Sequence, residues 1–260
     1  MNDLIDFRKD VHSQFGEDGI IEKLLEIVGA KNRWCCEIGA WDGVWLSNTR
    51  RLIKQGWNAA LIEADKEKLA ELRKNCTPFP RTVTINQRVK PGEMDDVLEH
   101  AGAPVDLDLF SLDVDGDEHA IWEGMKRYEP RLVVVESNYT FPPNVEFVQK
   151  KGLDIGNSAL SLSLLAKEKG YKLVCFNVIN CFFVKEDLFP LEGITPRRLQ
   201  ELFYLGATLQ MGIHSSYGGV RFLSGEMPWG RTSLRELPAM KDVARIFKVH
   251  LGNDYLALPV

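Results

Sequence analysis

The sequence predicts an α/β protein built on a mostly parallel, seven-stranded sheet with an antiparallel last strand and helices on both faces. Two observations lead to this prediction: strand-like apolar runs alternate with helix-like segments, and the connections between them are short. Such alternation implies right-handed crossovers between parallel strands. Polar residues follow most of the apolar runs, which indicates a ligand site at the carboxyl ends of the strands.

The composition is that of a globular protein. The chain has 260 residues, 45% hydrophobic and 27% charged, which suffices for one large domain with an appendage. A net charge of −5 offers no basic excess for nucleic acid. The five cysteines form no C-x-x-C pair and are expected to be reduced, buried thiols of a cytoplasmic protein. The polar N-terminus and the short apolar runs predict no signal peptide and no membrane contact.

The chain divides into a helical cap over residues 1–30, a core over 31–184 and an appendage over 185–260. In the cap, apolar residues with helical spacing predict a helix over 17–29. In the core, strand-like runs end near Ile38, Glu63, Asn86, Asp113 and Glu136. Helices are expected at about 47–55, 66–75, 93–101, 118–127 and 158–169. The last two runs, 171–176 and 181–184, are separated by a four-residue link, which predicts an antiparallel hairpin.

The appendage is predicted to be helical. Thr195-Pro196 is typical of an N-cap followed by proline at the first helical position, with a helix to about Leu205. Residues 206–232 are rich in Gly, Ser and His, and a last helix is expected from about 233 to 249. We interpret the appendage as a lid over the substrate or as a contact between subunits of a homo-oligomer.

The first strand carries the most informative motif. Its apolar run ends at Glu37, and a turn with Gly39, Asp42 and Gly43 follows. About twenty residues on, a second apolar run ends in Glu63, which can accept hydrogen bonds from ribose hydroxyls. The form E-x-G-x-x-D-G differs from G-x-G-x-x-G. It therefore argues against a nicotinamide oxidoreductase and favours S-adenosylmethionine.

A polar segment follows this turn. Ser47, Asn48 and Thr49 open the next predicted helix, where N-capping is their structural role. The same geometry offers N–H and hydroxyl groups to a carboxylate, such as the one on S-adenosylmethionine.

Glu37–Gly43 together with Leu61–Asp65 resembles the first two motifs of class I S-adenosylmethionine-dependent methyltransferases. Three further segments resemble the FkbM-like branch, which includes many O-methyltransferases of small molecules and glycans. They are Ser13–Gly19 (SQFGEDG), Leu112–Gly116 (LDVDG) and Val135–Asn138 (VESN). The resemblance covers about residues 13–184. It implies the Rossmann-like class I methyltransferase fold and a cap segment folded over the cofactor.

The residues expected to contact the cofactor are Glu37, Gly39, Asp42, Gly43, Ser47, Asn48, Glu63, Gln87, Arg88 and Asp113. The resemblance implies that Glu37, Gly39 and Asp42 line the methionine end and that Glu63 binds the ribose. It places Gln87 and Arg88, which follow the third strand, near adenine. It places Asp113 near the sulfonium or the acceptor. Trp41 and Trp45 are expected either to border the pocket or to pack in the core.

Methyl transfer to a hydroxyl requires alignment of the reactants and a base or a metal that handles the proton. Asp115 and His119 are base candidates after the fourth strand, and His214 is a third candidate in the appendage. His119 has a second interpretation as a surface residue, and Asp115 as part of a turn and helix cap.

Metal assistance is the other mechanism that the acidic strand ends allow. Asp113 or Asp115 would join Glu136 and Asn138 as oxygen ligands of one Mg²⁺-like ion. This arrangement resembles catechol-type O-methyltransferases, although Glu136-Ser137-Asn138 replaces an adjacent Asp-Asn pair.

The expected function is S-adenosylmethionine-dependent O-methylation of a small polar acceptor, such as a sugar, a glycan precursor or a secondary metabolite. Two alternatives stay open: an N-methyltransferase, and a non-catalytic protein that only binds S-adenosylmethionine. The density of carboxylates at strand ends four and five favours an enzyme, because a silent scaffold has less need of them.

Overall fold

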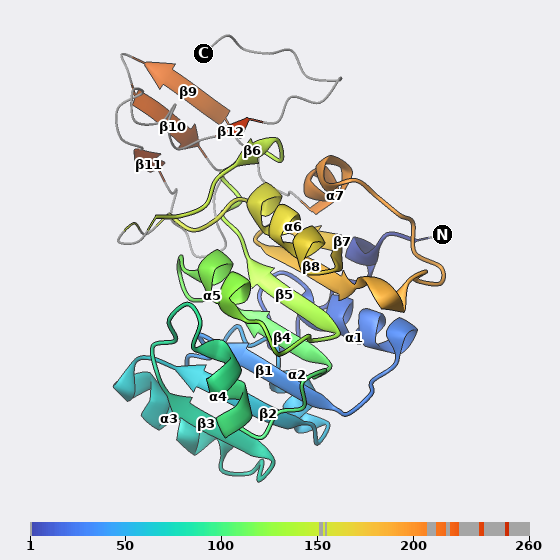
Figure 1. The fold of residues 1–260 in the computed structure, drawn as a ribbon, viewed down its shortest axis with the longest axis vertical. Coiled ribbons are helices and arrows are strands. Elements are labelled where there is room, and N and C mark those ends of the chain that lie inside the picture. The colour runs from blue at the N-terminus through green and yellow to red at the C-terminus, as the bar shows by residue number, and fades with distance from the viewer. Residues whose placement is uncertain are drawn as a thin grey trace.

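A computed structural model describes residues 2–150, 153 and 155–206, and beyond them the segments 212–216, 219–223, 234–236 and 248–249. Its centre is a seven-stranded sheet in the order β3-β2-β1-β4-β5-β8-β7 (Figure 1). The strands are β1 (Trp34–Ile38), β2 (Asn58–Glu63), β3 (Thr82–Asn86), β4 (Leu109–Leu112), β5 (Leu132–Glu136), β7 (Tyr171–Asn177) and β8 (Asn180–Lys185). Strands β1 to β5 pair in parallel, whereas β8 runs antiparallel to both β5 and β7. The predicted mixed sheet with its closing hairpin is therefore confirmed.

Helices cover both faces of this sheet (Figure 1). They are the short 3₁₀ helices η1 (Leu4–Phe7) and η2 (Glu186–Leu188) and the helices α1 (Glu17–Val28), α2 (Arg50–Lys54), α3 (Lys66–Cys76), α4 (Met94–His100), α5 (Glu118–Gly124), α6 (Ala159–Glu168) and α7 (Leu199–Gly206). One core packs α4, α5, α6 and α7 against the sheet, and the other packs η1, α1, α2 and α3. Consecutive strand residues alternate between them: Cys36 lies in the first core and Cys35 in the second.

Two predicted helices begin later than the sequence suggests. The helix expected at 47–55 begins at Arg50, and the helix expected after Thr195 begins at Leu199. The first difference has a tertiary cause, because Ser47, Asn48 and Thr49 all donate hydrogen bonds to Glu37 and are held outside the helix.

The appendage contains strands as well as α7. Strands β9 (Gly212–Ser216), β10 (Gly219–Leu223) and β11 (Leu234–Glu236) pair as an antiparallel sheet. The two-residue strands β6 (Val145–Glu146) and β12 (Lys248–Val249) form another pair. The helix expected over 233–249 is thus wrong at 234–236 and 248–249, where pairing with distant strands overrides local periodicity. The rest of that range lies outside the described residues.

The burial of the cysteines agrees with their prediction. All five are free and buried. None of the helices in the described ranges combines the length and the apolar character needed to cross a membrane.

Candidate functional site

A cavity of about 460 Å³ opens at the carboxyl ends of β1, β2, β3 and β4. This is the edge at which open α/β sheets bind ligands. Of the residues predicted from the sequence, the cavity is lined by Glu37, Gly39, Ser47, Asn48, Glu63, Gln87, Arg88, Asp113 and Asp115. The topology therefore brings most of the predicted site together from four strand ends.

Glu37 ties the segment after the first turn to the end of β1. Its buried carboxylate accepts hydrogen bonds from Ser47 Oγ at 2.7 Å, Asn48 N at 2.7 Å and Thr49 Oγ1 at 2.6 Å. Burial raises the pKa of Glu37, and these donors oppose the rise by stabilising the charged form. Glu37 thus fixes one wall of the cavity as well as lining it.

Gly39 is required by a close approach of two main chains. It has φ +77°, and a Cβ placed there would lie 1.7 Å from the carbonyl oxygen of Asp113. No larger residue fits between the end of β1 and the end of β4 without moving one of them. Gly39 therefore allows the ends of β1 and β4 to lie close together where both line the cavity.

Glu63 is anchored at the end of β2 and still faces the cavity. Its two carboxylate oxygens accept hydrogen bonds from Trp41 N at 2.8 Å and from Asp65 N at 2.7 Å. The side chain lines the cavity although it is only 7% exposed. Because each carboxylate oxygen can accept more than one hydrogen bond, Glu63 keeps acceptor capacity for a hydroxyl of a ligand.

Asp42 and Gly43, both expected to contact the cofactor, are absent from the described residues that line the cavity. Asp42 Oδ1 accepts hydrogen bonds from Val44 N at 2.9 Å and Trp45 N at 2.8 Å, so it closes the turn instead. Gly43 has φ +71°, and a Cβ there would lie 2.4 Å from Leu72 Cδ1 of α3. Both residues therefore stabilise the turn, and the neighbouring residues of the motif line the cavity.

Exposed apolar side chains border the cavity. Trp41 is 47% exposed and Trp45 is 66% exposed, and both line it together with Leu46. The ammonium of Lys68 lies 4.6 Å from the centre of the Trp41 ring. Of the two interpretations given for these tryptophans, the pocket border is therefore confirmed over the core.

The backbone around the cavity is strained. Trp41, Leu46 and Asp115 have φ of +50°, +58° and +59°, although none is glycine. Such conformations cost about 1–3 kcal/mol each and concentrate at functional sites. All three residues line the cavity.

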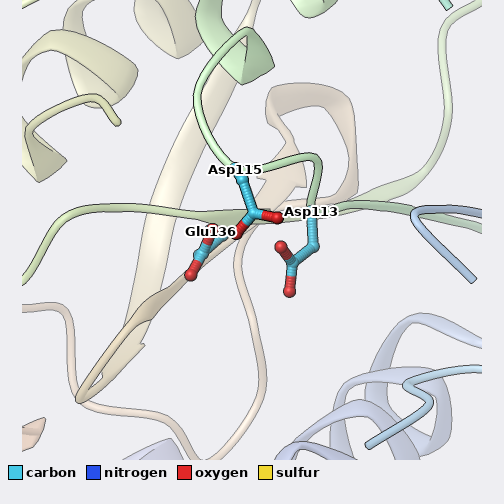
Figure 2. Close-up of side chains that lie close together, drawn as sticks. All are labelled: Asp113, Asp115 and Glu136. Carbon is cyan, nitrogen blue, oxygen red and sulfur yellow. The ribbon is translucent and has the colours of Figure 1, made fainter. Parts of the chain in front are cut away.

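Asp113, Asp115 and Glu136 form an acidic cluster beside the cavity (Figure 2). One oxygen of each lies within 4.8 Å of the others. Burial raises the pKa of Asp113 to about 7, while a hydrogen bond with Glu136 opposes the rise. Burial, and then the charge of Asp113, raise the pKa of Glu136 well above its usual range. Burial and mutual repulsion thus both disfavour full ionisation of this pair.

Asn138, the remaining predicted metal ligand, is engaged elsewhere. Its Oδ1 accepts hydrogen bonds from Thr140 N at 2.9 Å and Thr140 Oγ1 at 2.5 Å. Its Nδ2 donates to the carbonyl oxygen of Ile155 at 2.5 Å. Asn138 therefore orders the loop after β5, and the three carboxylates remain as the oxygen donors of the cluster.

Glu118 supports this cluster, although the sequence pattern did not single it out. It is 1% exposed and accepts hydrogen bonds from Val114 N at 3.1 Å and Gly116 N at 2.7 Å. Asn157 Nδ2 donates to its other oxygen at 3.0 Å. Glu118 thus holds the strained loop that carries Asp115. A carboxylate in the first turn of a helix is common, so no sequence signal marks this role.

Neither of the two histidines predicted as bases is found among the described residues that line the cavity. His119 is half-buried on α5 and is not among the described residues lining the cavity. Burial lowers its pKa, although the charges of Glu123, Glu168 and Glu146 oppose this. His214 lies on β9 opposite Arg221, and its side chain falls outside the described parts of the structure.

The cap segment before α1 is wound around two buried carboxylates. Asp18 Oδ2 accepts hydrogen bonds from three consecutive backbone N–H groups, those of residues 11–13. Glu17 Oε2 accepts from the next two, Gln14 N and Phe15 N. Asn180 Nδ2 of β8 donates to Glu17 Oε1 at 2.8 Å. This network brings Gln14 into the wall of the cavity.

No protein-family model matches this sequence. No curated protein matches it either. Solved structures show a likeness in fold. The O-methyltransferase from Bacillus cereus in complex with S-adenosylhomocysteine has a TM-score of 0.48 and 16% identity over 68% of this chain and 84% of that chain. The CcbJ methyltransferase from Streptomyces caelestis has a TM-score of 0.41 and 14% identity over 65% of this chain and 95% of that chain.

A third likeness is the precorrin-6y C5,15-methyltransferase from Geobacter metallireducens, with a TM-score of 0.43 and 14% identity over 71% of this chain and 98% of that chain. At these identities the likeness concerns the fold alone. The sheet order with its antiparallel β8 is that of the class I methyltransferase fold, as predicted.

Proposed function

We propose that this protein is an S-adenosylmethionine-dependent methyltransferase of the FkbM-like branch that methylates an oxygen of a small polar acceptor. A sugar, a glycan precursor or a secondary metabolite would fit this description. The observation that carries the proposal is one cavity that joins Glu37, Gly39 and Glu63 to the acids Asp113 and Asp115. The buried free thiols support a reducing, cytoplasmic setting.

The residues present fit the cofactor. Glu63 supplies a held carboxylate for the ribose, and Gln87 and Arg88 lie on the wall expected to face adenine. The Gln14 side chain lines the same cavity and has no hydrogen-bond partner among the described residues, so its amide is free for a polar ligand. When bound, S-adenosylmethionine would supply an electrophilic methyl group on a sulfonium.

The acidic cluster supports oxygen as the acceptor atom. A hydroxyl must lose its proton as the new bond forms, and a base works best when its pKa is near the operating pH. Asp113 meets this condition, since burial raises its pKa to about 7 and it lines the cavity. In this mechanism the ionised form of Asp113 takes the hydroxyl proton directly as the methyl group moves from sulfur to oxygen, and the proton later leaves to solvent.

A single Mg²⁺ is the second way in which this cluster can serve the reaction. Asp113, Asp115 and Glu136 offer hard oxygen ligands within 4.8 Å of one another, which suits such an ion. The two mechanisms differ in their response to chelation. Activity that survives EDTA and is unchanged by added Mg²⁺ supports the carboxylate base, whereas activity that EDTA abolishes and Mg²⁺ restores supports the ion.

The proposed activity is tested by measuring S-adenosylhomocysteine formation with a panel of sugars, nucleotide sugars, catechols and amines. We expect product with at least one hydroxyl acceptor, and mass spectrometry and NMR should place the new methyl group on oxygen. A methyl group on nitrogen would favour the N-methyltransferase alternative. S-adenosylhomocysteine binding without turnover on any acceptor would favour the non-catalytic alternative.

A further inference from the structure

A second cavity of about 280 Å³ adjoins the larger one. The two share Gln14, which lines both. The walls of the smaller cavity come from the segment before α1 and from Val178 in the turn between β7 and β8. Gln14 therefore stands at the boundary of both cavities, so a ligand of the larger one lies next to the smaller one.

The smaller cavity carries an excess of positive charge. Arg8 and Lys9 both line it, and neither forms an ion pair in the described part of the chain. Arg8 Nε donates to the carbonyl oxygen of Ile5 at 3.1 Å, which leaves the two terminal nitrogens of the guanidinium available. The one carboxylate on this wall, Asp10, accepts hydrogen bonds from Gly16 N and Ser13 Oγ.

The backbone that presents these two cations is fixed. Lys9 N donates to the carbonyl oxygen of Gly16 at 3.3 Å, and Gly19 N donates to that of Lys9 at 3.1 Å. A Cβ at Gly16 would lie 2.4 Å from Arg8 Cβ, and one at Gly19 would lie 2.0 Å from the carbonyl oxygen of Phe7. The start of α1 is thus pressed against residues 7–9, so both cations project from a defined position.

We propose that this second cavity binds an anionic group of the methyl acceptor, a phosphate or a carboxylate, so that the acceptor is an acidic small molecule such as a sugar phosphate or a uronic acid. This inference rests on the proposed function and names its substrate class. A guanidinium can bind either anion through two parallel hydrogen bonds, and the ammonium of Lys9 adds a second charge. Phe15 and the buried Val178, which pack together, are the apolar residues of its lining.

The test uses inorganic pyrophosphate as the probe, titrated into the full-length protein saturated with S-adenosylhomocysteine and followed by calorimetry. We expect Arg8→Met/Lys9→Met to weaken pyrophosphate binding by about tenfold or more, since hydrogen bonds to charged groups are lost. Lys9→Met alone keeps the Arg8–Ile5 hydrogen bond. We expect this variant to weaken pyrophosphate binding by about threefold. Arg73→Met/Lys74→Met changes a matched exposed pair on α3 and should leave binding unaltered.

Salt provides an independent readout. Binding by the wild type should weaken between about 0.05 and 0.5 M NaCl, because exposed charges are screened. Pyrophosphate binding that is equal in the wild type and in Arg8→Met/Lys9→Met would overturn the inference, as would no binding by the wild type at millimolar pyrophosphate.

Acceptors that share one sugar ring and differ in the group at carbon 6 then identify the anion. Transfer to glucose 6-phosphate above glucose supports a phosphate, transfer to glucuronate above glucose supports a carboxylate, and equal transfer to all three contradicts the inference. Failure of the proposed function has a different signature, namely no binding of S-adenosylhomocysteine. In that case pyrophosphate titration of the unliganded protein still decides the anion site.

Discussion

Gly39 lies directly against the main chain of Asp113: a Cβ at Gly39 would stand 1.7 Å from the Asp113 carbonyl oxygen. This contact joins the end of β1, which carries the motif expected to bind the cofactor, to the end of β4, which carries two of the three clustered acids. The distance between the expected methyl-donor site and the expected base thus depends on a position where only glycine fits.

Gly39→Ala is therefore expected to lower the free energy of unfolding by more than the strain of a positive φ alone would. Gly56 provides the matched control, since it has φ +82° and a Cβ added there would meet nothing within 4 Å. We expect Gly56→Ala to lower the free energy of unfolding by about 1–2 kcal/mol and Gly39→Ala by more than about 3 kcal/mol. Urea denaturation measures both. Equal losses would show that the contact with Asp113 relaxes easily.

Asp18→Ala should unfold the cap. The substitution leaves the N–H groups of residues 11–13 without their shared, partly buried acceptor, which should cost about 3 kcal/mol or more. Asp65→Ala removes an exposed helix cap that accepts from Glu67 N and Lys68 N, and should cost about 1 kcal/mol. Urea midpoints compare the two. A smaller loss for Asp18→Ala than for Asp65→Ala would contradict the role assigned to Asp18.

Asp113→Asn should change how stability depends on pH. The pKa of Asp113 is raised to about 7 in the folded protein, so its contribution to stability is complete below the usual carboxyl range and is lost as the pH rises through 7. The wild type therefore carries a penalty at pH 8 that the variant lacks. In EDTA, we expect the variant to melt several degrees above the wild type at pH 8, with a smaller gain or none at pH 5.

Asp117→Asn, on the same loop and exposed, is the control for that experiment. It should differ from the wild type by the same amount at both pH values. A gain for Asp113→Asn that is equally large at pH 5 and pH 8 would show that ionisation of Asp113 is not its cause.

His119→Gln should leave methyl transfer within about twofold of the wild type, because His119 does not line the described cavity. Asp113→Asn removes the proposed base and should lower kcat by about 10²–10⁴. The comparison uses any acceptor found in the panel, with the pH profile of kcat as the second readout. A large loss in His119→Gln would make the histidine a candidate base again.

The strand ends could be predicted from the sequence because their information is local. Apolar runs that stop at Glu37, Glu63 or Asp113 mark both the strand and the polar group that follows it. The late start of α2 could not be predicted, since it depends on Glu37 binding Ser47, Asn48 and Thr49 in three dimensions. In the appendage, the described part of 233–249 pairs as strands with distant segments, which local periodicity cannot reveal.

For the site residues too, roles that depend on local sequence could be predicted, whereas roles that depend on three-dimensional contacts could not. Glu63 was recognised by its place after a strand, and the structure puts it in the cavity. Asp42 belongs to the same motif, yet its carboxylate closes the turn, because two N–H groups lie within its reach. The roles of Asp18 and Glu118 depend on backbone N–H groups that only the folded loops bring together.

The central claim is that the cavity at the ends of β1 to β4 binds S-adenosylmethionine. Its most direct test is calorimetric titration of S-adenosylhomocysteine into the wild type, Glu63→Ala and the exposed control Glu67→Ala, with melting curves to confirm that each is folded. We predict one site per chain, binding weakened by about thirtyfold or more in Glu63→Ala, and no change in Glu67→Ala. No binding by the folded wild type at millimolar S-adenosylhomocysteine, or equal binding by all three proteins, would contradict the account.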